Sequence, residues 1–228
     1  ILSQNLKMMF SSTLSQNFSS TPFSFTSNTF EISTLGRPIL RKLSEPVKHS
    51  HFGSDALYEF IEKMKNTLHN SNGCGLAAPQ IGVSKQIFVA ELNAETMAGE
   101  ETVQSMPFTV FINPTIKPMP DPKRYTETWE SCLSLPGMCG LVKRPYHAEM
   151  TYFNAEGEQF LINAQGFVSV LLQHENDHLH GKLFIDQMND LSLLTKDDNL
   201  HELLEAIGHK DEPIVGSFQI TRLQDCQR

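Results

Sequence analysis

Two histidines four residues apart, with a glutamate directly after the first, are the residues best suited to chemistry. They are His174, Glu175 and His178, in the segment QHENDHLHG at residues 173–181. On a helix, residues four apart lie about 40° from each other around the axis, so both imidazoles can reach one metal ion. Glu175 lies beside this pair, where it can take a proton from a water held by the ion. The spacing therefore predicts a metal-dependent hydrolytic site.

The alternative is a polar patch on a solvated helix face, because short motifs also occur by chance. The apolar run at 167–172 leads into the histidines and predicts a buried helix. Burying two imidazoles and a carboxylate without partners is unfavourable, and a metal ion would remove that cost. We therefore favour the metal site.

A tetrahedral catalytic site needs a third protein ligand and an open position. In the metzincin pattern HExxHxxGxxH, Gly181 is present but Phe184 stands where the third histidine should be. A thermolysin-like protease would use a glutamate further along; Asp198 and Glu202 are near, but the usual surrounding signature is absent. An endopeptidase stays as the weaker alternative, and these patterns leave the third ligand open.

The elements that must position these residues follow from periodicity. Helical spacing predicts helices over about 54–69, 166–180 and 199–207. Strands are predicted at 86–90 and at 108–114, where a proline ends the run, and residues 142–153 should pair with 160–162 in a hairpin. The prediction is an α+β fold. Mostly antiparallel sheets pack around a central HExxH helix, with an N-terminal helix and a C-terminal helical tail.

Composition narrows the function classes. The chain has 228 residues and a formal charge of −8, which argues against a broad basic face for nucleic acid or an anionic membrane. Neither a run of about 18 apolar residues nor a secretory signal is found. Four cysteines, at 74, 132, 139 and 226, show no paired spacing, so we expect free thiols in a reducing compartment. These features predict a protein that is neither exported nor membrane-spanning. Separately, we expect a monomer in the bacterial cytoplasm.

The first 33 residues differ from the rest. Residues 10–30 are rich in Ser, Thr and Phe and contain no acid, which predicts a flexible extension. An organelle transit peptide is also Ser-rich and poor in acids, but it is usually Arg-rich, so targeting is the less favoured reading. We expect a catalytic domain over 34–190 and a C-terminal helix and tail over 191–228.

Three separated segments together resemble the peptide deformylases. Residues 73–80, GCGLAAPQ, are similar to the family motif GxGLAAxQ; residues 130–134, ESCLS, to EGCLS; and residues 174–179, HENDHL, to HExDHL. All three occur in the family's order, and the resemblance covers roughly residues 34–190. Three matches in order are far more specific than the helix motif alone.

The resemblance implies a role for the residues of each motif. It makes Cys132 the third metal ligand beside His174 and His178, and Fe²⁺ the physiological ion, although the ligand set also suits Zn²⁺, Ni²⁺ or Co²⁺. Glu175 becomes the general acid and base, and the Asp of the third motif, Asp177, should orient a ligand or a neighbouring basic residue.

The same resemblance implies an oxyanion hole and a substrate pocket. The side-chain amide of Gln80 and the backbone N–H of Leu133 would donate to the oxygen that becomes negative during attack. The expected substrate-binding residues are Gly75, Cys74, Ser131, Val170, Leu171 and Arg144. Ser131 replaces the family's glycine, and a serine at a positive φ would be strained, so we expect altered substrate contact there.

Gly73 and Gly75 have two other interpretations. A Rossmann phosphate loop needs a strand before the glycines and a helix after them, whereas a helix precedes them here and a strand follows. A plain tight turn is compatible with a site, because glycine also lets a substrate backbone approach closely.

The implied activity is removal of the N-formyl group from the initiator methionine of nascent peptides, with release of formate. A non-catalytic metal-binding module is the alternative outside the enzymes. Transient contact with the ribosome is a possible partnership, but docking through a basic C-terminal helix is doubtful, because residues 190–228 carry more acids than bases.

Overall fold

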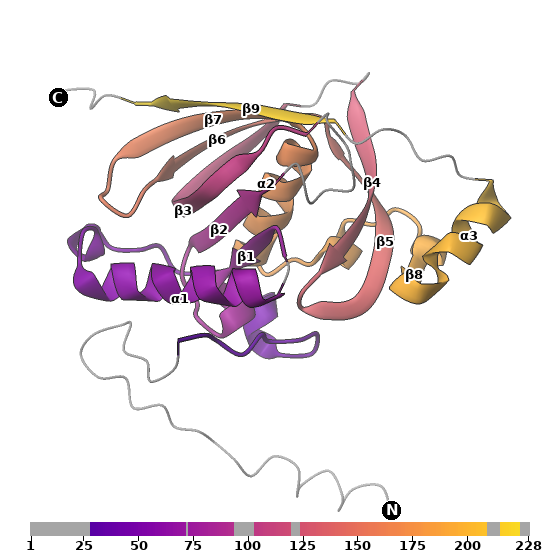
Figure 1. The fold of residues 1–228 in the computed structure, drawn as a ribbon, viewed down its shortest axis with the longest axis horizontal. Coiled ribbons are helices and arrows are strands. Elements are labelled where there is room, and N and C mark those ends of the chain that lie inside the picture. The colour runs from indigo at the N-terminus through magenta and orange to yellow at the C-terminus, as the bar shows by residue number, and fades with distance from the viewer. Residues whose placement is uncertain (1–27, 72, 94–102, 120–123, 209–214, 224–228) are drawn as a thin grey trace, which may run out of the picture.

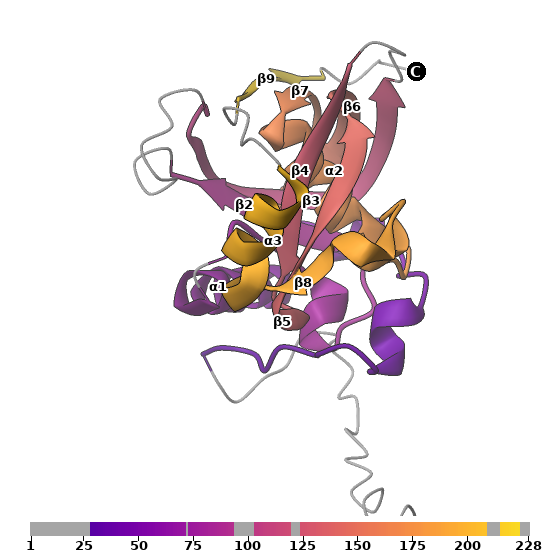
Figure 2. The same ribbon diagram turned by 90° about the vertical axis from the view of Figure 1, so that its right-hand side faces the viewer.

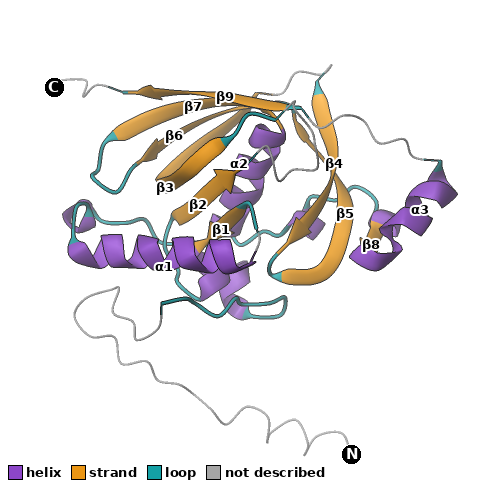
Figure 3. Ribbon diagram, in the orientation of Figure 1, coloured by secondary structure: helices purple, strands orange, loops and turns teal. Residues whose placement is uncertain are grey.

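The computed structural model describes residues 28–71, 73–93, 103–119, 124–208 and 215–223. The predicted extension therefore lies mostly outside the described residues, as does Cys226. Within the described ranges the chain forms two antiparallel sheets and three α-helices, which confirms the α+β prediction (Figures 1 and 3).

The larger sheet has six strands in the order β1-β2-β3-β6-β7-β9. Neighbouring strands in this sheet all run antiparallel. β6 and β7 form the hairpin that the sequence predicts, with Phe153 opposite Gln159. The strands are β1 (Gly75–Ala77), β2 (Ile87–Leu92), β3 (Met106–Met119), β6 (His147–Phe153), β7 (Gln159–Gly166) and β9 (Gly216–Arg222).

The smaller sheet carries the second motif. It consists of β4 (Tyr125–Cys132), β5 (Leu135–Pro145) and β8 (Leu194–Lys196), in that order. The register between β4 and β5 shifts at Ser131 and Cys132, immediately before the turn that joins the two strands. Such irregularities re-aim side chains, and this one lies next to the residues with the chemistry.

Strand alternation explains which side chains of β4 face inward. The buried residues Glu130 and Cys132 are two apart, and exposed Ser131 lies between them. Side chains two apart on a strand share a face. Arg144 of β5 is also buried and belongs to this inner face, because it contacts Glu130.

Helix α2 (Phe167–Leu179) lies between the sheets and contacts strands of both (Figure 1). Its first turns, with Val168 and Leu172, pack in a core with the larger sheet. Its polar second half, which includes His174 and His178, is buried as well. Leu183 and Phe184, after the helix, pack against Cys132 and Val142 of the smaller sheet. The sequence prediction of a buried histidine helix is therefore confirmed.

Helix α1 (Asp55–Ser71) covers a second core. Leu57, Phe60, Met64 and Leu68 recur along one face, and all four are almost fully buried. They pack with apolar side chains of β1 and β2, including Leu76. Figure 1 shows α1 crossing beside β1 and β2.

The C-terminal region departs most from the prediction. The predicted helix is α3 (Leu200–Ile207), which follows β8 and the 3₁₀ turn Asp197–Asn199 (Figure 2). Beyond it, β9 pairs along β7 from Phe160–Arg222 to Gly166–Gly216, a strand that the sequence pattern did not predict. The boundaries 34–190 and 191–228 remain predictions. β9 lies within 191–228, yet it pairs with the larger sheet, whose other strands lie within 34–190.

Two strand predictions were wrong in extent. β3 continues through Pro114 to Met119, with a register irregularity between Ile112 and Thr115 where the partner strand changes. The stretch 142–153 is two strands, because β5 ends at Pro145 and β6 begins at His147. Among the described residues, no helix combines the length and apolar character that a membrane span requires.

Candidate metal centre and active site

The structure brings together one thiol and two imidazoles. The ligand atoms of Cys132, His174 and His178 all lie within 4.8 Å of one another, and Cys132 Sγ lies 3.4 Å from His178 Nε2. Cys132 comes from the last position of β4, and the histidines are one turn apart on α2. This set matches the ligands that the sequence resemblance implies.

The donor chemistry fits a divalent transition metal. One thiolate with two imidazoles leaves an open position when a tetrahedral ion binds, and this set suits Fe²⁺, Zn²⁺, Ni²⁺ and Co²⁺ better than Mg²⁺ or Ca²⁺. All three residues are at most 8% exposed, so they are largely shielded from solvent. Gln80 Nε2 lies 3.4 Å from Cys132 Sγ, where it can hydrogen-bond to the thiolate.

Glu130 orients the first histidine. Its Oε2 lies 2.9 Å from His174 Nδ1, so His174 presents Nε2 to the metal position. The same carboxylate accepts from Arg144 Nε at 2.6 Å and Nη2 at 3.0 Å. Arg144 Nη1 donates to Asp177 at 2.8 Å, which confirms that Asp177 contacts a neighbouring basic residue. A buried carboxylate that holds a metal-binding histidine fixes both its tautomer and its ring orientation.

The charges in this cluster are balanced by their neighbours. Burial would raise the pKa of Glu130, but hydrogen bonds from His174 and Arg144 hold that pKa below its ordinary value. Burial opposes the charged form of His174, yet hydrogen bonds with Cys132 and Glu130 raise its pKa well above normal. Burial and the charge of His174 lower the pKa of His178, which favours the neutral imidazole that a metal needs.

Glu175 differs from the other carboxylates in this region. It is 3% exposed, and its Oε2 has no hydrogen-bond partner among the described residues. Burial raises the pKa of Glu175 to about 7. A carboxyl group with such a pKa can both take and give a proton at neutral pH. Gly75 provides the space for it, because a Cβ atom there would come within 2.6 Å of Glu175 Cδ.

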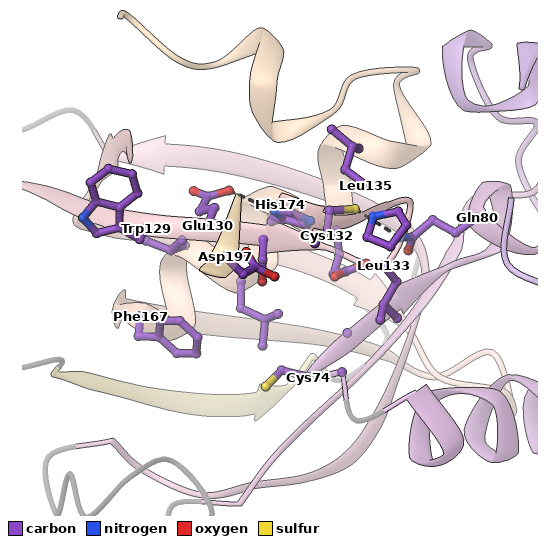
Figure 4. A pocket seen from close by; sticks show the side chains of 18 residues that line it. Cys74, Gln80, Trp129, Glu130, Cys132, Leu133, Leu135, Phe167, His174 and Asp197 are labelled. Carbon is purple, nitrogen blue, oxygen red and sulfur yellow. Dashed lines mark hydrogen bonds and ion pairs between the residues drawn. The ribbon is translucent and has the colours of Figure 1, made fainter. Parts of the chain in front are cut away.

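A cavity of about 390 Å³ opens beside the metal ligands. Figure 4 shows Gln80, Cys132 and His174 in one part of it, with Cys74 and Phe167 below them. The buried lining residues form its floor, whereas Ser131, Pro136, Gly137 and Asp197 are exposed and form its rim. The cavity is large enough to hold part of a peptide.

Gln80 is held with its amide N–H₂ toward the floor. It lies in the 3₁₀ turn Ala78–Ile81 and is 1% exposed. Its Oε1 accepts from the backbone N–H of Ala77 at 2.8 Å, so Nε2 must point the other way, toward Cys132 and Ser134. Leu133 follows Cys132 and also lines the cavity. Both predicted oxyanion residues therefore lie beside the candidate metal ligands.

The predicted pocket residues fall into two groups. Gly75, Cys74, Ser131, Val170 and Leu171 all line the cavity. Arg144 does not line it, because its guanidinium is engaged behind His174 by Glu130 and Asp177. Asn113 is the one described non-glycine residue with positive φ, so the backbone at Ser131 escapes the strain that we considered.

The sequence pattern missed several residues of the site. Glu130 lies inside the second motif, but nothing in its spacing shows that it reaches His174. Trp129 precedes it and lines the cavity, and Asp197 reaches the rim from the turn after β8. Asp197 carries no motif, and only the pairing of β8 with β5 brings it there.

Comparison with known proteins places these features in a family. Residues 29–193 match the family model described as polypeptide deformylase. The peptide deformylase of Saccharophagus degradans is 38% identical over 154 residues, which cover 68% of this chain and 81% of that protein.

The comparison with solved structures also finds peptide deformylases. The class I type b peptide deformylase of Acinetobacter baumannii, bound to Met-Ala-Ser, superposes with a TM-score of 0.65 at 29% identity, covering 70% of this chain and 98% of that one. The peptide deformylase of Synechococcus elongatus, in complex with actinonin, gives a TM-score of 0.63 at 29% identity, covering 85% and 96%.

Proposed function

Because the chain belongs to the polypeptide deformylase family, a family of metal-binding hydrolases, we propose that it removes the N-formyl group from the initiator methionine of newly made peptides. The products are formate and a peptide with a free amino group. One observation supports this most directly: Glu175, whose Oε2 has no hydrogen-bond partner among the described residues, lines the same cavity as Cys132 and His174, two members of the candidate metal cluster.

We propose Fe²⁺ as the physiological ion, with Zn²⁺, Ni²⁺ or Co²⁺ able to substitute. Cys132, His174 and His178 would hold it, and Glu130 would keep His174 in the correct tautomer. When bound, the ion supplies Lewis-acid polarisation of the carbonyl and lowers the pKa of a coordinated water.

The residues of this chain supply the proton transfer and the binding of the oxyanion. Glu175 takes a proton from the attacking water and delivers it to the nitrogen of methionine as the C–N bond breaks. Gln80 Nε2 and the Leu133 backbone N–H donate to the oxygen that becomes negative. Gln80 is suited to this because Ala77 already fixes its amide orientation. Fixed donors of this kind cost no reorganisation during the reaction.

The apolar part of the cavity suits a methionine side chain. Val170 and Leu171 of α2 line it together with Cys74 of the first motif, and Cys74 packs against the core cluster that contains Leu171. The Acinetobacter enzyme was solved with Met-Ala-Ser, the product expected from formyl-Met-Ala-Ser. We infer that methionine binds here and that the following residues extend toward the rim. Contact between Ser131 and the substrate is part of this proposal.

Formate release tests the proposal. Protein loaded anaerobically with Fe²⁺ is incubated with formyl-Met-Ala-Ser and with an internally cleavable peptide that carries no formyl group. We expect formate from the first and no cleavage of the second. Glu175→Gln should lower kcat/KM about 100-fold or more, whereas Glu127→Gln, an exposed residue of β4, should not. Cleavage of the internal peptide without formate release would support an endopeptidase instead.

Cytoplasmic location in a bacterium, a monomeric state and transient contact with the ribosome remain predictions. Cell fractionation, light scattering and co-sedimentation with ribosomes test them separately.

A further inference from the structure

The rim of the cavity carries a carboxylate from outside the matched part of the chain. The family model ends at residue 193, and Asp197 lies beyond it. Asp197 is exposed and lines the same cavity as Cys132 and Glu175, and Figure 4 draws it between Trp129 and Cys132. The reaction proposed for the residues on the cavity floor does not require a carboxylate at the rim.

Strand pairing holds Asp197 at the rim. β8 pairs with β5 in a register that sets Met138 opposite Lys196 and Cys139 opposite Thr195. Asp197 follows directly, as the first residue of a 3₁₀ turn. Burial of the Cys139 thiol, together with its interaction with the nearby Asp197 carboxylate, raises the pKa of Cys139 to about 11. The strand register therefore places Asp197 beside Cys139 while leaving Asp197 exposed.

The charge around Asp197 is not compensated. No Lys or Arg is among the described residues that line the cavity, whereas Glu130, Glu175 and Asp197 are. Within the same part of the chain, no basic side chain forms an ion pair with Asp197. Glu130 is neutralised by Arg144, and Glu175 lies on the floor. Asp197 is thus the unpaired acidic group that a bound peptide would contact where it extends from the cavity into solvent.

We propose that Asp197 is a specificity residue that favours peptides with a basic side chain shortly after the formylmethionine. This inference rests on the proposed function. With the formyl group at the metal ligands and methionine on the apolar wall, the second or third residue of the peptide reaches the rim. A lysine or arginine there meets an exposed carboxylate, and an acidic residue meets a like charge.

Matched substrates measure the effect. The probes are formyl-Met-Ala-Lys, formyl-Met-Ala-Gln and formyl-Met-Ala-Glu as C-terminal amides, with a second series that places the same residues directly after methionine. Formate release from the metal-loaded full chain should give kcat/KM about 2- to 5-fold higher for Lys than for Gln, the range of an exposed ion pair. Glu should be the poorest substrate. The preference should lie in KM and shrink toward one at high salt.

Two substitutions at Asp197 and one neighbouring control assign the effect. Asp197→Asn should bring the Lys-to-Gln ratio to about one, and Asp197→Lys should make Glu the better substrate. Asp198→Asn removes the same charge from the next, also exposed, residue, which does not line the cavity, so the ratio should stay at its wild-type value.

The outcomes separate this inference from the proposed function. If no peptide yields formate, the proposed function itself fails. If formate is released with equal kcat/KM for Lys, Gln and Glu in both series, only the role of Asp197 is overturned. It is also overturned if Asp198→Asn lowers the ratio as much as Asp197→Asn, because overall charge would then explain the preference.

Discussion

At Gly75, a Cβ atom would overlap the Glu175 carboxylate and come within 2.8 Å of its Cγ. Glu175 belongs to a buried helix and cannot retreat far without disturbing His174 beside it. We therefore expect Gly75→Ala to displace the carboxylate and lower kcat/KM for formyl-Met-Ala-Ser about 100-fold, the cost of a misplacement of roughly 1 Å. Metal affinity should fall less than kcat/KM, because the three atoms nearest to the added Cβ all belong to Glu175 and not to Cys132, His174 or His178. Normal turnover in this variant would show that Glu175 tolerates another position.

Substitution of Glu130 tests whether this residue positions His174 for metal binding without being needed for folding. Its carboxylate lies 2.9 Å from His174 Nδ1 and accepts two hydrogen bonds from Arg144. Glu130→Gln keeps the shape of the side chain but removes its charge. We therefore expect metal affinity to fall about 10- to 100-fold, measured by competition with a chelator. Glu127→Gln is the matched control on the same strand, where Glu127 forms only an exposed pair with Lys143. Equal affinities in the two variants would contradict the role of Glu130.

At the residue scale, the sequence predicted that Cys132, His174 and His178 belong together, but it did not predict the charged residues behind them. His174 and His178 follow from helical spacing, and Cys132 follows only from the family motif, because spacing could not separate it from Cys139. Arg144 was expected at the substrate. Its position on β5 turns it inward instead, toward Glu130 and Asp177. No local pattern specifies which buried charges meet across two sheets and a helix.

At the element scale, the junction between β7 and α2 sets where the histidines lie. Gly166 ends β7 with φ +59, and a Cβ atom there would overlap the carbonyl of Val215, coming within 2.9 Å of its carbon. Gly208, after α3, has φ +64 but open space around it. Both glycines have positive φ, but ψ is −134° at Gly166 and 26° at Gly208, so only Gly208 is in the left-handed region, and their packing differs as well.

Alanine at these positions should destabilise the fold by different amounts. Gly208→Ala should cost about 1 kcal/mol, because a residue with a Cβ atom disfavours the left-handed conformation. Gly166→Ala would combine positive φ with a ψ of −134°, outside the left-handed region, and would also force β9 away from the helix start, so we expect a total of roughly 2–4 kcal/mol. Urea unfolding followed by circular dichroism measures both. Equal losses would mean that neither the backbone conformation of Gly166 nor its contact with Val215 constrains this junction.

Elements with a strong pattern of their own could be predicted from the sequence, whereas strands that depend on a partner strand could not. Helices α1 and α2 and the β6–β7 hairpin carry strong apolar patterns or a clear turn. β5 contains Gly137 and Gly140 and lacks regular alternation, and β9 is mostly exposed and lacks a buried alternating face. β8 has only three residues. These strands exist because a partner strand is available, which a single segment of sequence does not reveal. The place of Asp197 was missed for the same reason.

At the scale of the whole molecule, the site joins parts that are otherwise packed separately. Cys132 belongs to the smaller sheet and to a core with Leu183 and Phe184, whereas α2 packs mainly in the core of the larger sheet. A metal ion held by Cys132, His174 and His178, as we propose, would therefore tie the smaller sheet to α2. Because a native site is absent from an unfolded chain, the binding free energy adds to the free energy of unfolding.

Metal removal should therefore lower thermal stability. With free ion at a thousand times Kd, binding adds about 4 kcal/mol to the free energy of unfolding, or roughly 10 °C in Tm for a chain of this size. Calorimetry before and after treatment with 1,10-phenanthroline, and again after the metal is restored, measures the shift. Cys132→Ser should abolish the metal-dependent part. Cys139→Ser, at another buried thiol of the same sheet, should keep it. An unchanged Tm on chelation, or a shift lost equally in both variants, would show that the ion does not link the two parts of the fold.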